Sequence, residues 1–155
     1  MSRPVRPLRV ALPKGRIMDD ALRLFERLGS GVEAEVLASR RLILPSRDGR
    51  FEFLPVKNID VPTYVEAGVA DAGVVGLDVL GERDPDVLHP LDLRFGGCRL
   101  AVAAPGGTPY PHLPGGVTPR VATKYVESAR RFFAARGLQA DLIHISGSVE
   151  IAPLL

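Results

Sequence analysis

Short apolar runs alternate with helix-spaced segments along this chain, and this alternation constrains its fold more than any other feature. Residues 8–12 form an apolar run, and apolar side chains then recur at helical spacing over residues 17–28. Asp19 and Asp20 favour a helix start there, and Gly29 is typical of a C-terminal helix cap. Strands that alternate with helices in this way predict an α/β fold with a parallel sheet.

The rest of the chain continues this pattern. Residues 42–44 and 51–56 flank a Pro-, Asp- and Gly-containing turn, which predicts an antiparallel hairpin. The further predicted strands are residues 72–75, which we expect to be buried, 87–93, 98–104, 120–122 and 141–145. The further predicted helices are residues 60–68, a single turn at 78–80, 126–136 closed by Gly137, and one that begins near Ser148 and Glu150. Residues 105–119 are rich in Pro and Gly, which predicts a loop.

Composition places the chain among globular proteins with one or two small domains. It has 155 residues, a formal net charge of +2, 46% hydrophobic residues and 25% charged residues. That charge excludes a dedicated nucleic-acid-binding arm. The one cysteine, Cys98, excludes an internal disulfide framework and a multi-cysteine metal site, and we expect it to be a small buried side chain. Neither a signal peptide nor a membrane span is visible, so we expect a cytoplasmic protein.

The glycine pair at 96–97 predicts a crossing between two lobes, one of residues 1–96 and one of residues 97–155. The chain ends about two turns into its last predicted helix, with no strand after it. We therefore expect the second lobe to be incomplete and the chain to be a fragment.

Four predicted strand ends lead through small residues into helices, near Gly15, Gly76, Thr123 and Gly147. In open α/β sheets such junctions share the carboxyl edge, where helix N-termini present free amides to anions such as phosphate. Two of the three lysines, Lys14 and Lys124, lie at these junctions, which favours an anion site over solvated surface charges. Neither Walker A nor Gly-x-Gly-x-x-Gly spacing is present, so spacing alone does not identify a nucleotide.

Other polar residues are weaker candidates. Arg40 and Arg41 have guanidinium groups suited to phosphate. Because the chain has seventeen arginines, any one of them is a weak indication of a site. Asp78 and Asp92 suit a base, a ribose hydroxyl or a magnesium ion, but they equally suit a helix cap and a strand end. The histidines lack partners at ligand spacing, so we expect no metal site built from protein ligands.

Six blocks of sequence, in this order, resemble the catalytic subunit of ATP phosphoribosyltransferase in its short form. They are Val-Ala-Leu-Pro-Lys-Gly-Arg at 10–16, Asp-Val-Pro-Thr-Tyr-Val-Glu at 60–66, Ala-Asp-Ala-Gly-Val-Val-Gly-Leu-Asp at 70–78, Phe-Gly-Gly-Cys-Arg-Leu at 95–100, Arg-Val-Ala-Thr-Lys-Tyr at 120–125 and Gly-Ser-Val-Glu-Ile-Ala-Pro at 147–153. The resemblance implies the first step of histidine biosynthesis. In that reaction an adenine ring nitrogen of ATP attacks the anomeric carbon of phosphoribosyl pyrophosphate, and magnesium-bound pyrophosphate leaves.

The resemblance also implies roles for residues at matching positions. Arg16 and Arg40 would be the catalytic residues, in contact with the phosphates of ATP and the departing pyrophosphate. The ATP-binding residues would be Lys14, Gly15, Arg16, Arg40, Asp78 and Asp92. The phosphoribosyl pyrophosphate side would be formed by Thr123, Lys124, Tyr125, Ser148 and Glu150. Mg²⁺ would be bound through the substrate phosphates, and the fold would be two-lobed and periplasmic-binding-protein-like, of type II.

Members of this family continue into an Asp-x-x-x-Thr-Gly-x-Thr phosphate loop that these 155 residues do not contain. We therefore expect the chain to retain most of the ATP side and to lack half of the other side. The resemblance implies a homo-oligomer and a histidyl-tRNA-synthetase-like regulatory subunit as partner. Two alternatives stay open: a solute-binding protein of the same fold, which should carry an export signal, and a catalytically inert nucleotide-binding or regulatory chain of the same family.

Overall fold

A computed structural model describes residues 6–107, 118–147 and 149–154 of the chain. The chain divides into two compact units, Met1–Cys98 and Arg99–Leu155. The division falls after Cys98, one residue beyond the glycine pair at which two lobes are expected. The strands and helices of the first unit are β1 (Leu8–Pro13), α1 (Arg16–Arg27), α2 (Ala34–Leu37), β2 (Leu44–Pro45), β3 (Phe51–Val56), the 3₁₀ helix η1 (Asn58–Asp60), α3 (Val61–Glu66), β4 (Ala72–Gly73) and α4 (Leu77–Arg83).

The sheet of the first unit has the strand order β2-β3-β1-β4, with β1 parallel to both β3 and β4. Its longest pairing runs from Leu8 opposite Phe51 to Pro13 opposite Val56. The predicted hairpin is confirmed, because β2 pairs with β3 in the antiparallel direction. Gly49 supplies the positive φ of +68° that its turn requires. The predicted α/β class with parallel strands is therefore confirmed.

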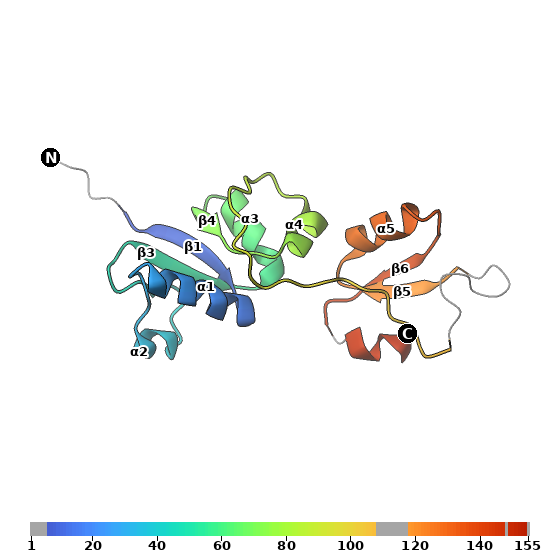
Figure 1. Ribbon diagram of the computed structural model, residues 1–155, viewed down its shortest axis with the longest axis horizontal. Coiled ribbons are helices and arrows are strands. Elements are labelled where there is room, and N and C mark those ends of the chain that lie inside the picture. Colours follow the sequence, from blue (N-terminus) through green and yellow to red (C-terminus); the bar gives the residue numbers. More distant parts are fainter. Residues whose placement is uncertain (1–5, 108–117, 148, 155) are drawn as a thin grey trace. The chain divides into compact units, whose positions relative to one another are not determined.

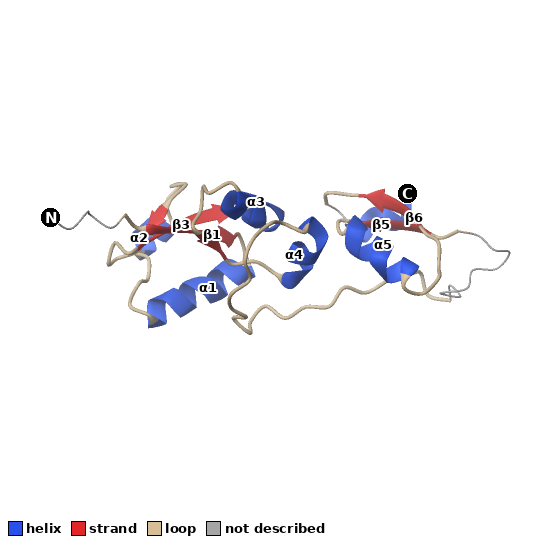
Figure 2. Cartoon of the chain, turned by 90° about the horizontal axis from the view of Figure 1, so that it is seen from above, coloured by secondary structure: helices blue, strands red, loops and turns tan. Residues whose placement is uncertain are grey.

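Helices cover both faces of this sheet, α1 on one side and α3 on the other (Figure 2). Successive residues of a strand face opposite sides, so β1 contributes to two separate cores. The rings of Phe25 on α1 and Phe53 on β3 pack edge to face with centroids 4.7 Å apart. The buried side chains on the α1 side are Val10, Leu12, Ala21, Val32, Leu44 and Phe53, and those on the α3 side are Ala11, Val56, Val61 and Ala70.

The second unit is smaller, with β5 (Arg120–Thr123), α5 (Val126–Ala134), β6 (Asp141–His144) and the 3₁₀ helix η3 (Val149–Leu154). β5 and β6 are parallel, with Thr123 opposite His144 (Figure 1). α5 ends near Gly137, whose φ of +65° confirms it as the predicted cap. None of the helices in the described ranges is both long and apolar enough to cross a membrane.

The strands predicted at residues 87–93 and 98–104 are wrong. The described part of this stretch contains no strand, and its side chains are largely exposed: Leu88 by 93% and Leu91 by 67%. An apolar run forms a strand only where a neighbouring edge offers backbone partners, and no such pairing occurs here. Cys98 is accordingly exposed rather than buried.

Three smaller expectations are also corrected. The strand predicted at residues 72–75 is reduced to the two residues of β4, both exposed, because it lies at the edge of the sheet. The single turn predicted at residues 78–80 is the longer α4, which ends at Asp84 in the left-handed conformation. The last predicted helix is the 3₁₀ helix η3, and Ser148 lies outside the described residues. Most of the loop predicted at 105–119, residues 108–117, also lies outside them.

Candidate functional site

The turn between β1 and α1 is an exposed cationic junction of the first unit. Lys14, Gly15 and Arg16 are all exposed, and Gly15 is the N-cap of α1 with a φ of +105°. A Cβ on Gly15 would meet no atom within 4 Å, so its backbone, rather than crowding, requires glycine. The N-terminus of α1 has no side-chain cap, which leaves its first amides available to an anion.

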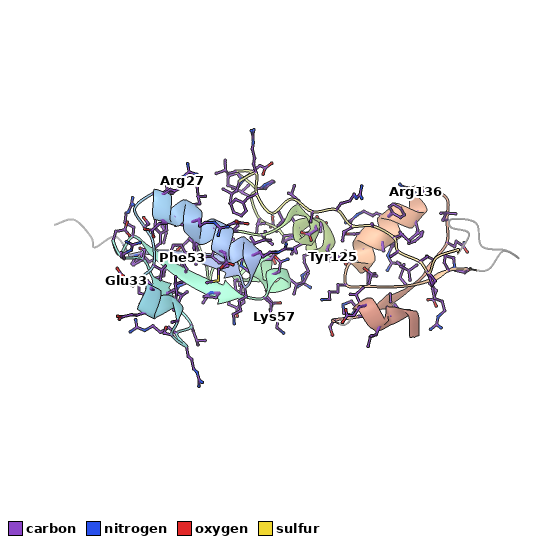
Figure 3. All side chains as sticks on the ribbon, turned by 60° about the horizontal axis from the view of Figure 1, so that its bottom comes forward. Arg27, Glu33, Phe53, Lys57, Tyr125 and Arg136 are labelled. Carbon is purple, nitrogen blue, oxygen red and sulfur yellow. The ribbon has the colours of Figure 1, made fainter. Side chains whose placement is uncertain are left out.

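A lysine from the neighbouring strand joins this junction. The amide of Lys14 donates a hydrogen bond of 2.9 Å to the carbonyl of Val56, the last residue of β3. Lys57 follows Val56 directly and is exposed at the same carboxyl edge of the sheet (Figure 3). The sequence analysis missed Lys57, although one signal was present: all three lysines of the chain directly follow a parallel strand, namely β1, β3 and β5.

The cations of this carboxyl edge have no acidic partners. Among the described residues, neither Lys14, Arg16 nor Lys57 forms an ion pair. Arg23, about two turns further along α1 than the helix start, pairs with Asp20 instead. Unpaired cations next to uncapped amides form a site that attracts phosphate.

At the opposite, amino edge of the same sheet, basic side chains in the described part of the chain are paired with carboxylates. The guanidinium of Arg6 binds both carboxylate oxygens of Asp71, which also accepts the Arg9 amide at 2.8 Å. The hydrogen bonds from Arg6 are the main reason that the pKa of Asp71 lies below its usual value. Arg9 in turn donates to Glu52 on β3 at 2.8 Å. These contacts link β1 to β3 and to the residue that precedes β4.

A second paired cluster at the amino edge closes the β2–β3 turn. Asp48 accepts hydrogen bonds from the hydroxyls of Ser46 at 2.6 Å and Ser30 at 2.7 Å, and from the guanidinium of Arg50. These donors, Ser46 first, hold the pKa of Asp48 well below its usual range. Ser30 and Ser46 are buried, so the cluster is a structural clamp.

The predicted residue Asp78 lies in the first turn of α4, after β4 at the carboxyl edge. Its Oδ1 occupies the space that a Cβ on Gly76 would need, so residue 76 must be glycine for Asp78 to fold back over it. Val74, which lies between β4 and Gly76 in the sequence, donates its amide to the carbonyl of Ala11 on β1 at 3.0 Å. The Asp78 turn therefore follows β4, which pairs with β1, and Lys14 directly follows β1.

The segment that follows α4 returns to the start of α1. A Cβ on Gly96 would lie 3.4 Å from a side-chain carbon of Ile17, and Phe95 packs against the α1-side core. Asp92 accepts the amide of Arg94 at 2.8 Å, which forms a local turn around a left-handed Arg94 with a φ of +56°. One carboxylate oxygen of Asp92 thus accepts a hydrogen bond from the backbone of this segment.

Among the described residues, no hydrogen bond or ion pair joins Arg40 to the β1–α1 junction. Arg40 and Arg41 lie in the exposed stretch between α2 and β2, where the hydroxyl of Ser39 accepts the Arg41 amide. Within the described part of the chain, no hydrogen bond or ion pair involves the guanidinium of Arg40. Its predicted role in phosphate binding stays a prediction.

In the second unit, the predicted Thr123, Lys124 and Tyr125 form the junction between β5 and α5. The hydroxyl of Thr123 accepts the amide of Tyr125 at 3.0 Å, which shapes the turn. Lys124 is exposed, and Tyr125 is the N-cap of α5, which has no side-chain cap. The arrangement repeats that of the β1–α1 junction: a strand end, a lysine and an uncapped helix of nine residues.

Glu150 is exposed in the first turn of η3, which packs against β5. No group of three or more His, Cys, Asp or Glu side chains within the described ranges is arranged to hold a metal ion.

Comparison with known proteins gives a consistent picture. Residues 57–155 match the family described as HisG, ATP phosphoribosyltransferase. The chain is 48% identical over 146 residues to the ATP phosphoribosyltransferase of Syntrophotalea carbinolica, covering 94% of this chain and 67% of that protein. It is also 48% identical over 150 residues to the enzyme of Sorangium cellulosum, covering 97% and 69%.

The fold agrees with a solved structure, an ATP phosphoribosyl transferase (HisG:HisZ) complex from Thermotoga maritima. The TM-score is 0.68 at 28% sequence identity, over 95% of this chain and 68% of that chain. The six sequence blocks, the α/β fold and the two closely related enzymes agree with one another. The chain therefore belongs to the ATP phosphoribosyltransferase family.

Proposed function

We propose that this chain acts as an ATP phosphoribosyltransferase, the first step of histidine biosynthesis. The enzyme transfers the phosphoribosyl group of phosphoribosyl pyrophosphate to an adenine ring nitrogen of ATP and releases pyrophosphate. One observation beyond family membership supports this assignment: Lys14, Arg16 and Lys57 form no ion pair with any described residue and lie along one sheet edge, next to the uncapped start of α1. This edge suits a polyanion.

The reaction demands little covalent help from the protein. A nitrogen–carbon bond forms at the anomeric carbon while the bond to the pyrophosphate oxygen breaks, so the protein must hold two polyanions in line and offset the leaving charge. In the proposed arrangement Lys14, the Gly15 backbone and Arg16 bind ATP phosphates. Arg40 and Lys57 neutralise the departing pyrophosphate.

The remaining assignments follow the two units. Asp78 and Asp92 would border the nucleotide, Asp92 with the carboxylate oxygen that does not accept the Arg94 amide. Thr123, Lys124 and Tyr125, with Ser148 and Glu150, would form the phosphoribosyl pyrophosphate side. We assign the first unit the ATP-side pocket and the pair of units a periplasmic-binding-protein-like fold of type II, with lobes at residues 1–96 and 97–155.

Magnesium would arrive on the substrate phosphates. An ion carried in this way needs cations and amides around the phosphates rather than a cage of carboxylates, and the Lys14–Lys57 edge offers such groups. When bound, Mg²⁺ neutralises charge on the leaving pyrophosphate. The protein groups hold the phosphate oxygens that the ion leaves free.

A HisZ-like, histidyl-tRNA-synthetase-like regulatory subunit is the proposed partner, together with further copies of the chain. The structural relative from Thermotoga maritima, which is a HisG:HisZ complex, supports this proposal. The cytoplasm stays the predicted location.

Two measurements test the function. Calorimetric titration with ATP should show binding that Arg16→Ala weakens roughly tenfold or more, because a charge-assisted phosphate contact is lost. Arg23→Ala is the matched control on the same helix, since that guanidinium pairs with Asp20. Equal ATP affinity in the Arg16 variant would refute the phosphate assignment.

The second measurement is formation of phosphoribosyl-ATP from ATP and phosphoribosyl pyrophosphate with Mg²⁺. Product formation that depends on Arg16 supports the full reaction. ATP binding without any product, with or without the HisZ-like partner, would instead identify a nucleotide-binding chain of the family.

A further inference from the structure

A side-chain contact ties the start of α1 to the segment that ends the first unit. A Cβ on Gly96 would lie 3.4 Å from Cγ1 and 3.8 Å from Cδ1 of Ile17, so the Gly96 backbone lies directly against this side chain. Ile17 is the second residue of α1 and is half-buried. The contact therefore acts on the first turn of the helix.

The segment around Gly96 has a conformation that its own residues fix. Gly96 has a φ of +67°, which favours glycine, and Phe95 packs against the α1-side core. Asp92 accepts the amide of Arg94, whose φ of +56° is also left-handed. The segment is thus held in place from its own side, and it gives Ile17 a fixed surface to pack against.

The residue that makes this contact also carries one of the amides that open the helix. The amides of Met18 and Asp19 donate to the carbonyl of Gly15 at 2.9 and 3.3 Å. Among the described residues, the amides of Arg16 and Ile17 have no backbone acceptor, as is usual for the first residues of a helix. A phosphate at this helix start would accept hydrogen bonds from these two amides.

We propose that Ile17 and Gly96 are positioning residues for phosphate binding at the β1–α1 junction. Their contact holds the amides of the first turn of α1 in the arrangement that a phosphate requires. Donors that are already ordered bind more tightly than donors that lose conformational freedom on binding. This inference rests on the proposed function, and its test separates the failure of one from the failure of the other.

Calorimetric titration of Ile17→Ala with ATP tests the contact. The substitution keeps the amide and removes the two carbons that lie near Gly96. Alanine is also the better helix former, so the helix itself is not weakened by propensity. ATP affinity should fall about fivefold, because the first turn must then be ordered on binding. Ile17→Val keeps Cγ1, the carbon nearest Gly96, and should restore affinity to within about twofold of wild type.

Leu22→Ala is the matched control on the same helix, since Leu22 packs against the α1-side core. It should lower the melting temperature and leave ATP affinity unchanged. An equal loss of ATP affinity in Leu22→Ala would overturn the proposal, because any loosening of α1 would then suffice. Equal affinities of wild type and Ile17→Ala would overturn the positioning role and retain the anion site. Failure of the wild type to bind ATP would overturn both.

A second pair of variants tests the contact from the side of Gly96. Gly96→Ala and Gly49→Ala place a side chain at a φ of +67° and +68°, so the two variants carry similar backbone strain. A Cβ on Gly49 would meet no atom within 4 Å, whereas one on Gly96 would meet Ile17. Both variants should lose similar stability, but only Gly96→Ala should weaken ATP binding, by about threefold. Equal ATP affinities of these two variants would overturn the role of Gly96.

Discussion

Both edges of the first sheet carry basic side chains, and we propose opposite roles for the two edges. At the amino edge, Arg6, Arg9 and Arg50 are all bound by carboxylates. At the carboxyl edge, Lys14 and Lys57 have no acidic partner among the described residues. Charge alone therefore does not mark a functional site; the absence of an internal partner does. We expect substitutions at the amino edge to change stability and those at the carboxyl edge to change binding.

The largest expected effect is on binding at the carboxyl edge. The double variant Lys14→Ala, Arg16→Ala should weaken ATP affinity about 100-fold, since each cation contributes a charge-assisted contact of about 1.5 kcal/mol or more. Its melting temperature should stay within a few degrees of wild type. Calorimetry and thermal unfolding measure the two quantities. A large loss of stability instead would break the comparison between the edges.

The next effect is on stability at the amino edge. Ser46 is 5% exposed, donates to Asp48 and accepts the Phe51 amide at 3.0 Å. Ser46→Ala leaves that amide without its acceptor and should cost about 2 kcal/mol in urea unfolding, with ATP affinity unchanged. The exposed Ser39→Ala is the control for serine removal and should cost far less. If Ser46→Ala weakened ATP binding, the separation of roles would fail.

A smaller effect sharpens the comparison within the carboxyl edge. Gly15→Ala places a side chain at a φ of +105°, which should cost about 1–2 kcal/mol of stability and distort the junction that Lys14 and Arg16 flank. Gly97→Ala is the matched control, because Gly97 has open space and no positive φ. Chemical denaturation of both variants provides the measurement. Equal stabilities would show that Gly15 is not required by its backbone conformation.

The smallest effect is pH-dependent. Because Arg6 and the Arg9 amide lower the pKa of Asp71 in the folded chain, Asp71 contributes stability above the unfolded-state pKa of about 3.9, and this contribution is lost as pH falls through the lower folded value. Asp71→Asn should thus cost about 1 kcal/mol near neutral pH and nearly nothing at strongly acidic pH. Urea unfolding across that range checks the sign. A constant difference at all pH values would contradict it.

Sequence patterns predicted the first half of this fold well because its elements carry local signals. β1 and α1 follow from apolar spacing and Gly29, and the β2–β3 hairpin follows from its turn. Residues 87–104 show the limit of such patterns. Their apolar side chains suit a strand, but the pattern cannot specify a neighbouring strand with which the backbone would pair. The described residues supply no such strand.

The candidate site was predicted in part for a similar reason. Lys14 and Gly15 stand in a recognisable strand–loop–helix junction. Lys57 stands between a strand and a 3₁₀ helix, so only the parallel pairing of β1 and β3 places it beside Lys14.

The location of the three lysines has a practical consequence for chemical labelling. Because each one directly follows a parallel strand, amine-selective acylation modifies only strand-end junctions and the chain's own α-amino group. Mass spectrometry of the acylated peptides then reads each junction separately, with Lys14 and Lys57 reporting on one unit and Lys124 on the other. Protection of a given lysine by a phosphate-bearing compound would identify which junction that compound occupies.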